Sequence, residues 1–486
     1  MDRAPSQDGA GPPGKPLVSV MGSDEAEMGR GAKTLLSPSA VIDRLRSVLT
    51  GSGDHSIAQR MAGAAFIIRV MSAAIAYVSQ VLMARWMGGS EFGIYVSVWV
   101  WVLLLGHFSN LGLASAAQRF IPEYAGRGDE DGLRGFLKGA RLIGMASGTV
   151  IAALGLTGLW LAGPSIGTGL GVPLALAAIC LPLYVLTDIQ DGIARSQNWT
   201  DLALGPPYLI RPVILLAGMA AGHMLGLAAN ATTAMAAAVI ATWAAGMIQF
   251  WLLGRRLKGR VAAGPRRYEG RFWLATSVPI FLVEAFYLAL TYTDIILLKQ
   301  FRPAEEVAIY WAAVKTLALV AFIYFSVAAA AAHRFSEYHT AGDRQKLSEF
   351  LSASIRWTFY PSLAATIVVL ALGKPFLMLF GPDFVAGYPA MFVVSIGLLA
   401  RAAVGPVERL LSMSGQQRLC ALIYATAFAT AVILCVLLIP PFGMMGAASA
   451  TAIALTLESV LLFWVTRTRL GLTVSPFARR SPAAAE

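Results

Sequence analysis

The sequence predicts an all-α polytopic membrane protein, with about twelve transmembrane helices in two parallel six-helix repeats. Three observations lead to this fold class: the composition, a series of long apolar runs, and an internal repeat. Of the 486 residues, 57% are hydrophobic and only 13% are charged, whereas soluble domains carry roughly 25% charged residues. So low a charge content indicates that much of the protein surface meets lipid, where charge is costly.

The apolar runs are long enough to cross a membrane as helices. A transmembrane helix needs roughly 20 mostly apolar residues, whereas a barrel strand has about 10 residues of alternating character. The runs here are continuously apolar, so they predict helices rather than a barrel. The predicted spans are residues 61–83, 93–117, 139–162, 171–190, 203–224, 229–253, 272–298, 307–332, 355–380, 388–408, 419–439 and 443–465.

The basic residues between these spans predict the orientation of the chain. Lys and Arg gather in the loops that follow even-numbered spans, whereas the loops after odd-numbered spans carry few. We therefore expect the even loops and both termini to be cytoplasmic. The most basic stretch, residues 254–271, is predicted to link an N-terminal lobe of residues 58–253 to a C-terminal lobe of residues 272–470. The net charge of +11 arises mostly from such loops, which argues against a nucleic-acid-binding face.

The two ends of the chain are polar. Residues 1–57 are rich in Gly, Pro, Ser and charge and contain no early apolar run, so they predict a disordered cytoplasmic extension rather than a signal peptide. Residues 471–486 are predicted to form a cytoplasmic tail. The three cysteines lie in or beside apolar segments without a Cys–His cluster, so we expect no metal site.

The two halves of the sequence resemble each other. Residues 61–120 align without a gap onto residues 276–335, and the shared polar positions in the loops are the strongest part of the match. The matched polar positions include Glu91 with Glu306 and Tyr95 with Tyr310. After a slippage of one residue, Asp129 matches Asp343. Because each half has an even number of spans, both halves enter the membrane in the same orientation and the repeats are parallel.

Three motifs carry a resemblance to a known family. They are Gly88-Gly-Ser-Glu-Phe-Gly-Ile-Tyr95, Phe380-Gly-Pro-Asp-Phe384 and Pro441-Phe-Gly-Met-Met-Gly-Ala-Ala448. With the duplicated layout, the chain resembles the polysaccharide biosynthesis (Wzx-like) flippases, a branch of the multidrug/oligosaccharidyl-lipid/polysaccharide (MOP) exporter superfamily. The similarity covers about residues 58–470.

The resemblance implies a MATE-like, V-shaped pair of six-helix lobes around a cavity that opens to alternate sides of a bacterial inner membrane. The implied substrate is an undecaprenyl-diphosphate-linked oligosaccharide, flipped outward for capsule, O-antigen or exopolysaccharide assembly. Membrane lipids, and the polysaccharide polymerase and glycosyltransferases of the same pathway, are the implied partners. Fold alone does not give function, so the site is considered separately.

Ionisable residues inside the predicted spans are the candidate site residues, because an unpaired charge in lipid is costly. The interior is mainly cationic, with one clear carboxylate, Glu284. The interior cations are Arg69, Arg211, Lys315 and Arg401. Guanidinium and ammonium groups bind phosphate oxygens, so we expect a cationic cavity that receives a diphosphate head group. The alternative is that these side chains pair with one another or extend to the membrane interface.

Arg69 and Glu284 occupy equivalent positions of the two repeats, and we expect them to form a gating pair across the opening between the lobes. Glu284 is also the best candidate for coupling transport to protons or sodium, and Asp294, nearer a span end, is a second carboxylate for that role. The alternative for Glu284 is a plain structural ion pair. Pro279, five residues before Glu284, is a predicted hinge. No cofactor is expected besides such a coupling ion.

Two other functions stay open. A cation-coupled multidrug exporter of the same superfamily would share the duplicated plan, but it would need a more acidic or aromatic cavity than this basic interior suggests. A membrane polysaccharide polymerase or ligase would place its catalytic groups in a large outer loop, and the predicted outer loops are short. We find no phosphate-binding glycine loop, nucleophile motif or metal-ligand spacing, so we expect a transporter rather than an enzyme.

Overall fold

The chain is helical throughout the part that the structure describes. The computed structural model describes residues 54–163, 169–472, 474 and 476, with side chains from Val70 onward except at residues 329, 332 and 333. The described chain divides into two units after Ile67, and the contacts and cavities below concern the unit that begins at Ile68. The predicted extension and tail, residues 1–57 and 471–486, lie almost entirely outside the described residues.

The described helices confirm the predicted all-α class, and no strand occurs among them. In chain order they are α3 (Asp54–Ser109), α4 (Leu113–Gly126), α5 (Glu130–Ala162), α6 (Gly171–Ser196), α7 (Thr200–Gly205), η2 (Pro206–Ile210), α8 (Arg211–Met224), α9 (Ala231–Lys258), α10 (Gly270–Phe301), α11 (Ala304–Thr340), α12 (Arg344–Ala371), α13 (Gly373–Phe380), η3 (Pro382–Gly387), α14 (Tyr388–Val404), α15 (Val407–Met413), α16 (Gln417–Phe442), α17 (Met444–Val465) and η4 (Thr466–Leu470). Such a run of long apolar helices is the architecture that a lipid environment requires.

Eleven segments of the described chain are long and apolar enough to cross a membrane. The first, Val70–Gly126, contains two of the predicted spans, 61–83 and 93–117, whereas each other predicted span overlaps a segment of its own. Gly88 separates the two, because its backbone angles (φ 75°, ψ 169°) are not helical and bend α3. The prediction of about twelve spans therefore differs from the eleven observed segments only because two predicted spans share the segment that contains this bend.

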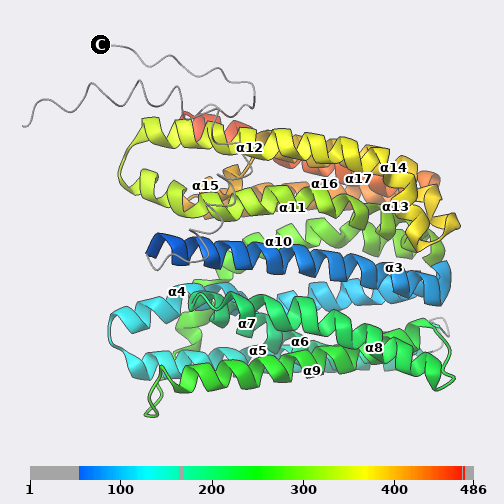
Figure 1. Ribbon diagram of the computed structural model, residues 1–486, viewed down its shortest axis with the longest axis horizontal. Coiled ribbons are helices and arrows are strands. Elements are labelled where there is room, and N and C mark those ends of the chain that lie inside the picture. Colours follow the sequence, from blue (N-terminus) through cyan, green and yellow to red (C-terminus); the bar gives the residue numbers. More distant parts are fainter. Residues whose placement is uncertain (1–53, 164–168, 473, 475, 477–486) are drawn as a thin grey trace, which may run out of the picture. The chain divides into compact units, whose positions relative to one another are not determined.

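The helices of the second unit pack in two groups. α4, α5, α6, α8 and α9 form one connected set of contacts, and α11, α12, α14, α16 and α17 form another. Figure 1 shows the first set in cyan and green and the second in yellow to red. Helix α10 contacts α4 and α5 of the first set and α16 and α17 of the second. The division into lobes 58–253 and 272–470 stays a prediction, with α10 as the helix that joins the two sets.

Equivalent glutamates of the two sequence repeats make the same contact. Glu91 Oε2 accepts a hydrogen bond from the backbone N–H of Ala231, 2.8 Å away, at the start of α9. Glu306 Oε1 accepts one from the backbone N–H of Met444, 2.6 Å away, at the start of α17. The first N–H groups of a helix have no partner inside it, and the helix dipole favours an anion there. Each glutamate thus ties its own helix to the last long helix of the same half.

Equivalent aspartates also cap equivalent helices. Asp129 accepts from the Gly132 N–H at the start of α5, and Asp343 accepts from the Lys346 N–H at the start of α12. Each aspartate follows a glycine with a left-handed φ. These two shared aspartates therefore serve as helix N-caps in both repeats.

The basic linker is held against α5 rather than extended from it. α9 continues to Lys258, and residues 259–269 then turn back along α5 to the start of α10. The backbone N–H of Arg267 donates to the Asp131 carbonyl (2.9 Å), and the Arg134 guanidinium donates to the Ala262 carbonyl (2.7 Å). These bonds place the start of α10 on the N-terminal set of helices.

Candidate functional site

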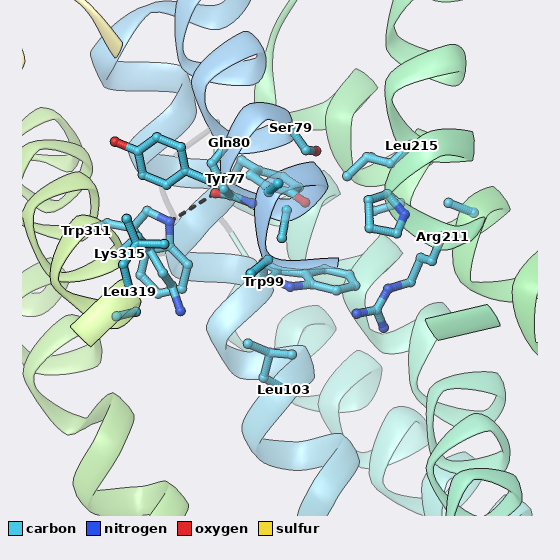
Figure 2. A pocket seen from close by; sticks show the side chains of 18 of the residues that line it. Tyr77, Ser79, Gln80, Trp99, Leu103, Arg211, Leu215, Trp311, Lys315 and Leu319 are labelled. Atoms are coloured by element: carbon cyan, nitrogen blue, oxygen red, sulfur yellow. Dashed lines mark hydrogen bonds between the residues drawn. The ribbon is translucent and has the colours of Figure 1, made fainter. Parts of the chain in front are cut away.

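The first cavity combines apolar walls with two cations. It has a volume of about 520 Å³ and lies among α3, α8, α9 and α11. Figure 2 shows Arg211 and Lys315 entering it from different helices, with Trp99 between them. The other aromatic and polar side chains on its wall are Tyr77, Ser79, Gln80, Tyr95, Trp311 and Phe322.

A local break in the helix positions Arg211. α8 begins at Arg211 directly after η2, a π-helical turn that starts with Pro206 and Pro207. Proline has no N–H to donate to the preceding turn, and single π turns recur at functional sites. The Arg211 guanidinium lies over two aromatic rings, 5.3 Å from the Trp99 centroid and 5.6 Å from that of Tyr184.

Lys315 is held by aromatic faces as well. Its Nζ lies 4.0 Å from the ring centroid of Trp311 and 5.9 Å from that of Tyr292. The indole Nε1 of Trp311 donates to Gln80 Oε1 (3.0 Å), which fixes the ring beneath the ammonium group. No Asp or Glu lines this cavity, and among the described residues neither Lys315 nor Arg211 forms an ion pair. Cation–π contacts of this kind stabilise by about 0.5–2 kcal/mol and leave the charge unneutralised.

The second cavity is larger and its charges are paired. It has a volume of about 850 Å³ and shares Ala73, Ala76 and Phe322 with the first. Its cations each lie beside a carboxylate. These pairs are Arg195 with Asp191 (2.8 Å), Arg401 with Glu458 (3.4 Å) and Arg409 with Glu408 (3.5 Å).

Arg401, a predicted cavity cation, therefore lines the second cavity and is neutralised there. Glu458 is fully buried, and the Arg401 side chain is 12% exposed. The guanidinium also lies over the rings of Tyr287 and Tyr324, at 4.9 and 5.0 Å. The structure thus brings Arg211 and Lys315 into one cavity and places Arg401 in the wall of the next.

Glu284 lies in the second cavity and contacts the N-terminal half of the chain. The Ser115 hydroxyl donates to Glu284 Oε1 at 2.5 Å, and His107 Nε2 lies 3.8 Å from Glu284 Oε2. On its other side, His107 Nδ1 lies 3.1 Å from Asp188, which also accepts a hydrogen bond from the Asn110 side chain. His107 thus bridges a carboxylate on α6 and a carboxylate on α10.

The sequence reasoning gave neither His107 nor Asp188 a role. Asp188 lies within the predicted span 171–190, so the rule that selected Glu284, an ionisable residue inside a span, also applied to it. His107 lies in the interior of the predicted span 93–117 and is its only histidine. Both line a third cavity, of about 260 Å³, whose wall also includes Arg211.

Asp294 lies apart from Glu284. It is ten residues further along α10, which places it about 15 Å away along the helix axis. The Tyr310 hydroxyl donates to Asp294 at 2.7 Å and the Thr451 hydroxyl at 3.0 Å, and the side chain is buried. It lines none of the three cavities above, so the structure does not bring the two predicted coupling carboxylates together.

Pro279 lies where α10 passes from one set of helices to the other. Before it, Trp273 is fully buried against Phe136 of α5, with ring centroids 5.3 Å apart. After it, Phe286 packs against Phe428 of α16, with ring centroids 6.1 Å apart. A proline inside a helix removes one backbone hydrogen bond and weakens the helix there.

The side chain of Arg69 lies outside the described residues, so its predicted contact with Glu284 stays a prediction. The partners that the described residues give to Glu284 are Ser115 and His107.

Two family models match the sequence. The model described as polysaccharide biosynthesis protein matches residues 60–339, more than half of the chain, and the model described as MatE matches residues 279–437. The sequence has no significant match among curated proteins.

Several solved transporters share the fold. The lipid II flippase MurJ, in its inward closed conformation, aligns at a TM-score of 0.66 and 15% identity over 83% of this chain and 87% of its own. An inward-facing multidrug resistance MATE transporter of the MOP superfamily aligns at 0.66 and 14% over 84% and 98%. A MOP transporter from Pyrococcus furiosus, described as having a binding pocket of reverse polarity, aligns at 0.63 and 13% over 87% and 97%. At these identities the likeness establishes the fold that the MATE and MurJ proteins have in common.

Proposed function

We propose that this chain, which belongs to the polysaccharide biosynthesis protein family, moves an undecaprenyl-diphosphate-linked oligosaccharide across the membrane. It is a multi-pass membrane transporter of the MOP superfamily rather than an enzyme, as the Gly88–Tyr95 motif led us to expect. The observation that carries the proposal is the first cavity, where two cations, Arg211 and Lys315, face the same space without a carboxylate partner.

The two cations suit a diphosphate. An unpaired charge is costly away from water, so a site with two of them favours a ligand that brings two negative charges. The guanidinium of Arg211 can bind two phosphate oxygens at once, whereas the Lys315 ammonium acts as a point charge. Because Arg211 lies on α8 and Lys315 on α11, a diphosphate bound between them would contact both halves of the chain.

The same cavity argues against an exporter of organic cations. A cationic drug would be repelled by Arg211 and Lys315, because no carboxylate of the wall offsets their charge, and the faces of Trp99 and Trp311 are already occupied by these cations. The alternative of a multidrug exporter predicts an acidic or aromatic cavity, whereas this cavity carries two unpaired cations.

We assign ion coupling to Glu284 and the bending point to Pro279, as the sequence led us to propose. Support for Glu284 comes from its place beside His107, at a contact between α3 and α10 that a relative movement of the two halves would break. Asp294 is a weaker candidate for ion coupling, and Arg401 is a weaker candidate for diphosphate binding, because each is already satisfied by partners inside the C-terminal half. The same proposal places the protein in the bacterial inner membrane with both termini in the cytoplasm. Its proposed partners are the glycosyltransferases and the polymerase of the same pathway.

Binding of undecaprenyl diphosphate to the purified chain in lipid nanodiscs tests the proposal. We expect Arg211→Gln and Lys315→Gln each to weaken binding about tenfold to a hundredfold, the effect of losing one charge-assisted hydrogen bond. Arg334→Gln is the matched control, since Arg334 is exposed and its ion-pair partner among the described residues is Glu337. Binding of ethidium together with no binding of undecaprenyl diphosphate would show that the chain is a drug exporter instead.

The coupling role of Glu284 has its own test. Transport of a lipid-linked oligosaccharide into vesicles is expected to depend on a proton or sodium gradient, and Glu284→Gln to remove that dependence. Transport that ignores both gradients, with the Glu284→Gln variant fully active, would leave Glu284 with a structural role only.

A further inference from the structure

The second cavity has a different chemistry from the first, and the proposed function uses only Glu284 of its wall. Arg401 and Arg409, which line it, are paired with Glu458 and Glu408 at 3.4 and 3.5 Å, and Arg195 is paired with Asp191 at 2.8 Å. The net charge of the wall and its ion-pair partners is therefore small, although Glu284 adds one further carboxylate. A cavity of this kind gives no advantage to an ionic ligand.

The wall nevertheless offers many hydrogen-bonding groups. Tyr208 and Tyr287 present phenols, and Gln118 presents an exposed amide. Carboxylates accept hydrogen bonds, guanidinium groups donate them, and phenol and amide groups do both. An uncharged ligand with many hydroxyl groups, each both donor and acceptor, would satisfy such a wall.

The aromatic rings add a second feature. Arg401 and Tyr424 already lie against the ring of Tyr287, whereas Tyr208, which is 44% exposed, offers an aromatic ring to the cavity. A tyrosine combines an apolar ring with a polar tip, so it can cover the C–H face of a sugar and still bond a hydroxyl. The volume of about 850 Å³ is at the upper end of the range for small-ligand pockets, roughly 300–1,000 Å³.

The two cavities adjoin. Ala73 and Ala76 of α3 and Phe322 of α11 line both. The small side chains of the two alanines leave the shared wall thin on the α3 side. A ligand with a charged group in the first cavity can therefore place a neighbouring neutral group in the second.

We propose that the second cavity is a subsite for the neutral glycan of the substrate, separate from the first cavity, which takes the diphosphate. This inference rests on the proposed function and assigns sugar specificity to the residues of the second cavity. Gln118 and the Tyr208 hydroxyl are the groups that discriminate between glycans, because neither has a hydrogen-bond partner among the described residues and neither belongs to an ion pair.

Two ligands separate this inference from the proposed function. One is undecaprenyl diphosphate, and the other is the same lipid carrying a neutral glucose trisaccharide. Their dissociation constants are measured with the full chain in nanodiscs. In the unmodified protein the trisaccharide lipid is expected to bind at least tenfold more tightly than the bare lipid, since several hydrogen bonds are added.

The variants Gln118→Ala and Tyr208→Phe are expected to reduce that advantage about threefold to tenfold each and to leave binding of the bare lipid unchanged. Tyr268→Phe is the matched control, because Tyr268 is half-exposed and lies in the linker, outside both cavities. The same lipid carrying a trisaccharide with a uronic acid is expected to gain less affinity over the bare lipid than the neutral trisaccharide lipid does.

The outcomes are distinguishable. Equal binding of the bare and trisaccharide lipids overturns the glycan subsite and leaves the diphosphate site intact, as does an equal loss for both lipids in Gln118→Ala. No binding of either lipid overturns the proposed function instead. Tighter binding of the uronic-acid lipid than of the neutral one would show that the second cavity recognises charge, which contradicts the inference.

Discussion

The buried ion pair between Arg401 and Glu458 allows a prediction whose size follows from the structure. Glu458 is completely buried, Arg401 is 12% exposed, and their closest atoms, Nη2 and Oε1, are 3.4 Å apart. With an effective dielectric constant of about 20, two unit charges at this distance attract by about 5 kcal/mol. Removing one partner of a buried pair costs roughly 3–5 kcal/mol, because the other charge is left uncompensated.

We therefore expect Arg401→Met and Glu458→Leu each to lower the free energy of unfolding by about 3–5 kcal/mol. The double variant is expected to return to within about 1–2 kcal/mol of the unmodified protein, since it leaves no buried charge. The assay is a double-mutant cycle on the purified protein, with unfolding by sodium dodecyl sulfate followed through tryptophan fluorescence.

The exposed pair of Arg334 and Glu337 is the control. Its atoms are only 3.0 Å apart, but the side chains are 55% and 48% exposed, so each substitution there should change stability by less than about 1 kcal/mol. The reasoning is refuted if Arg401→Met costs as little as the surface substitutions. It is also refuted if the double variant remains as unstable as the two single variants.

Three further changes test the packing and the helix caps. Trp273→Ala removes a fully buried side chain at the start of α10 and should cost about 3–5 kcal/mol of stability, measured by the same unfolding assay. Gly93→Ala should destabilise by about 1–3 kcal/mol, because a Cβ at Gly93 would overlap the backbone carbonyl of Ala304 and push α3 from α11. The Lys346 N–H and ammonium hold the pKa of Asp343 below its ordinary 3.8, so this carboxylate stabilises the fold above that pH and loses the effect as pH falls further. Asp343→Ala should accordingly lower the thermal midpoint at pH 7, with a difference that shrinks below about pH 4.

Each of these three substitutions has a control. Two controls are exposed positions at which stability should not change, and the third is the equivalent cap of the other repeat, which should respond in the same way. Trp464 is 60% exposed, so Trp464→Ala should leave stability almost unchanged. A Cβ at Gly126 would meet no atom within 4 Å, so Gly126→Ala should be neutral. Asp129, the equivalent cap of the other repeat, also has a lowered pKa, because it accepts from Gly132 and lies beside Arg267, and Asp129→Ala should show the same pH dependence as Asp343→Ala. Stability that changes as much at these exposed positions as at the buried ones would contradict the packing argument.

The fold class followed from the sequence because it depends on composition along the chain. Each apolar run long enough to cross a membrane forms a helix in the structure. Two of the predicted spans lie in one continuous segment, which bends at Gly88. The repeat was also visible in the sequence. Glu91 and Glu306 make equivalent contacts with helix starts 140 and 138 residues further along the chain. Asp129 and Asp343 cap the helices that begin directly after them. Capping is a local interaction, so residues close together in sequence are enough to predict it.

The pairing of the charged residues was decided by the tertiary structure. The sequence identified Arg211, Lys315 and Arg401 as one cationic group, but only the packing of α8, α11 and α14 separates the first two from the third. Glu458 neutralises Arg401 from 57 residues further along the chain, and His107 meets Glu284 across the two halves. A span's composition shows that it crosses the membrane, but not which face of the helix meets which neighbour. The partner of each interior charge depends on that face, and therefore on the packing of all the helices together.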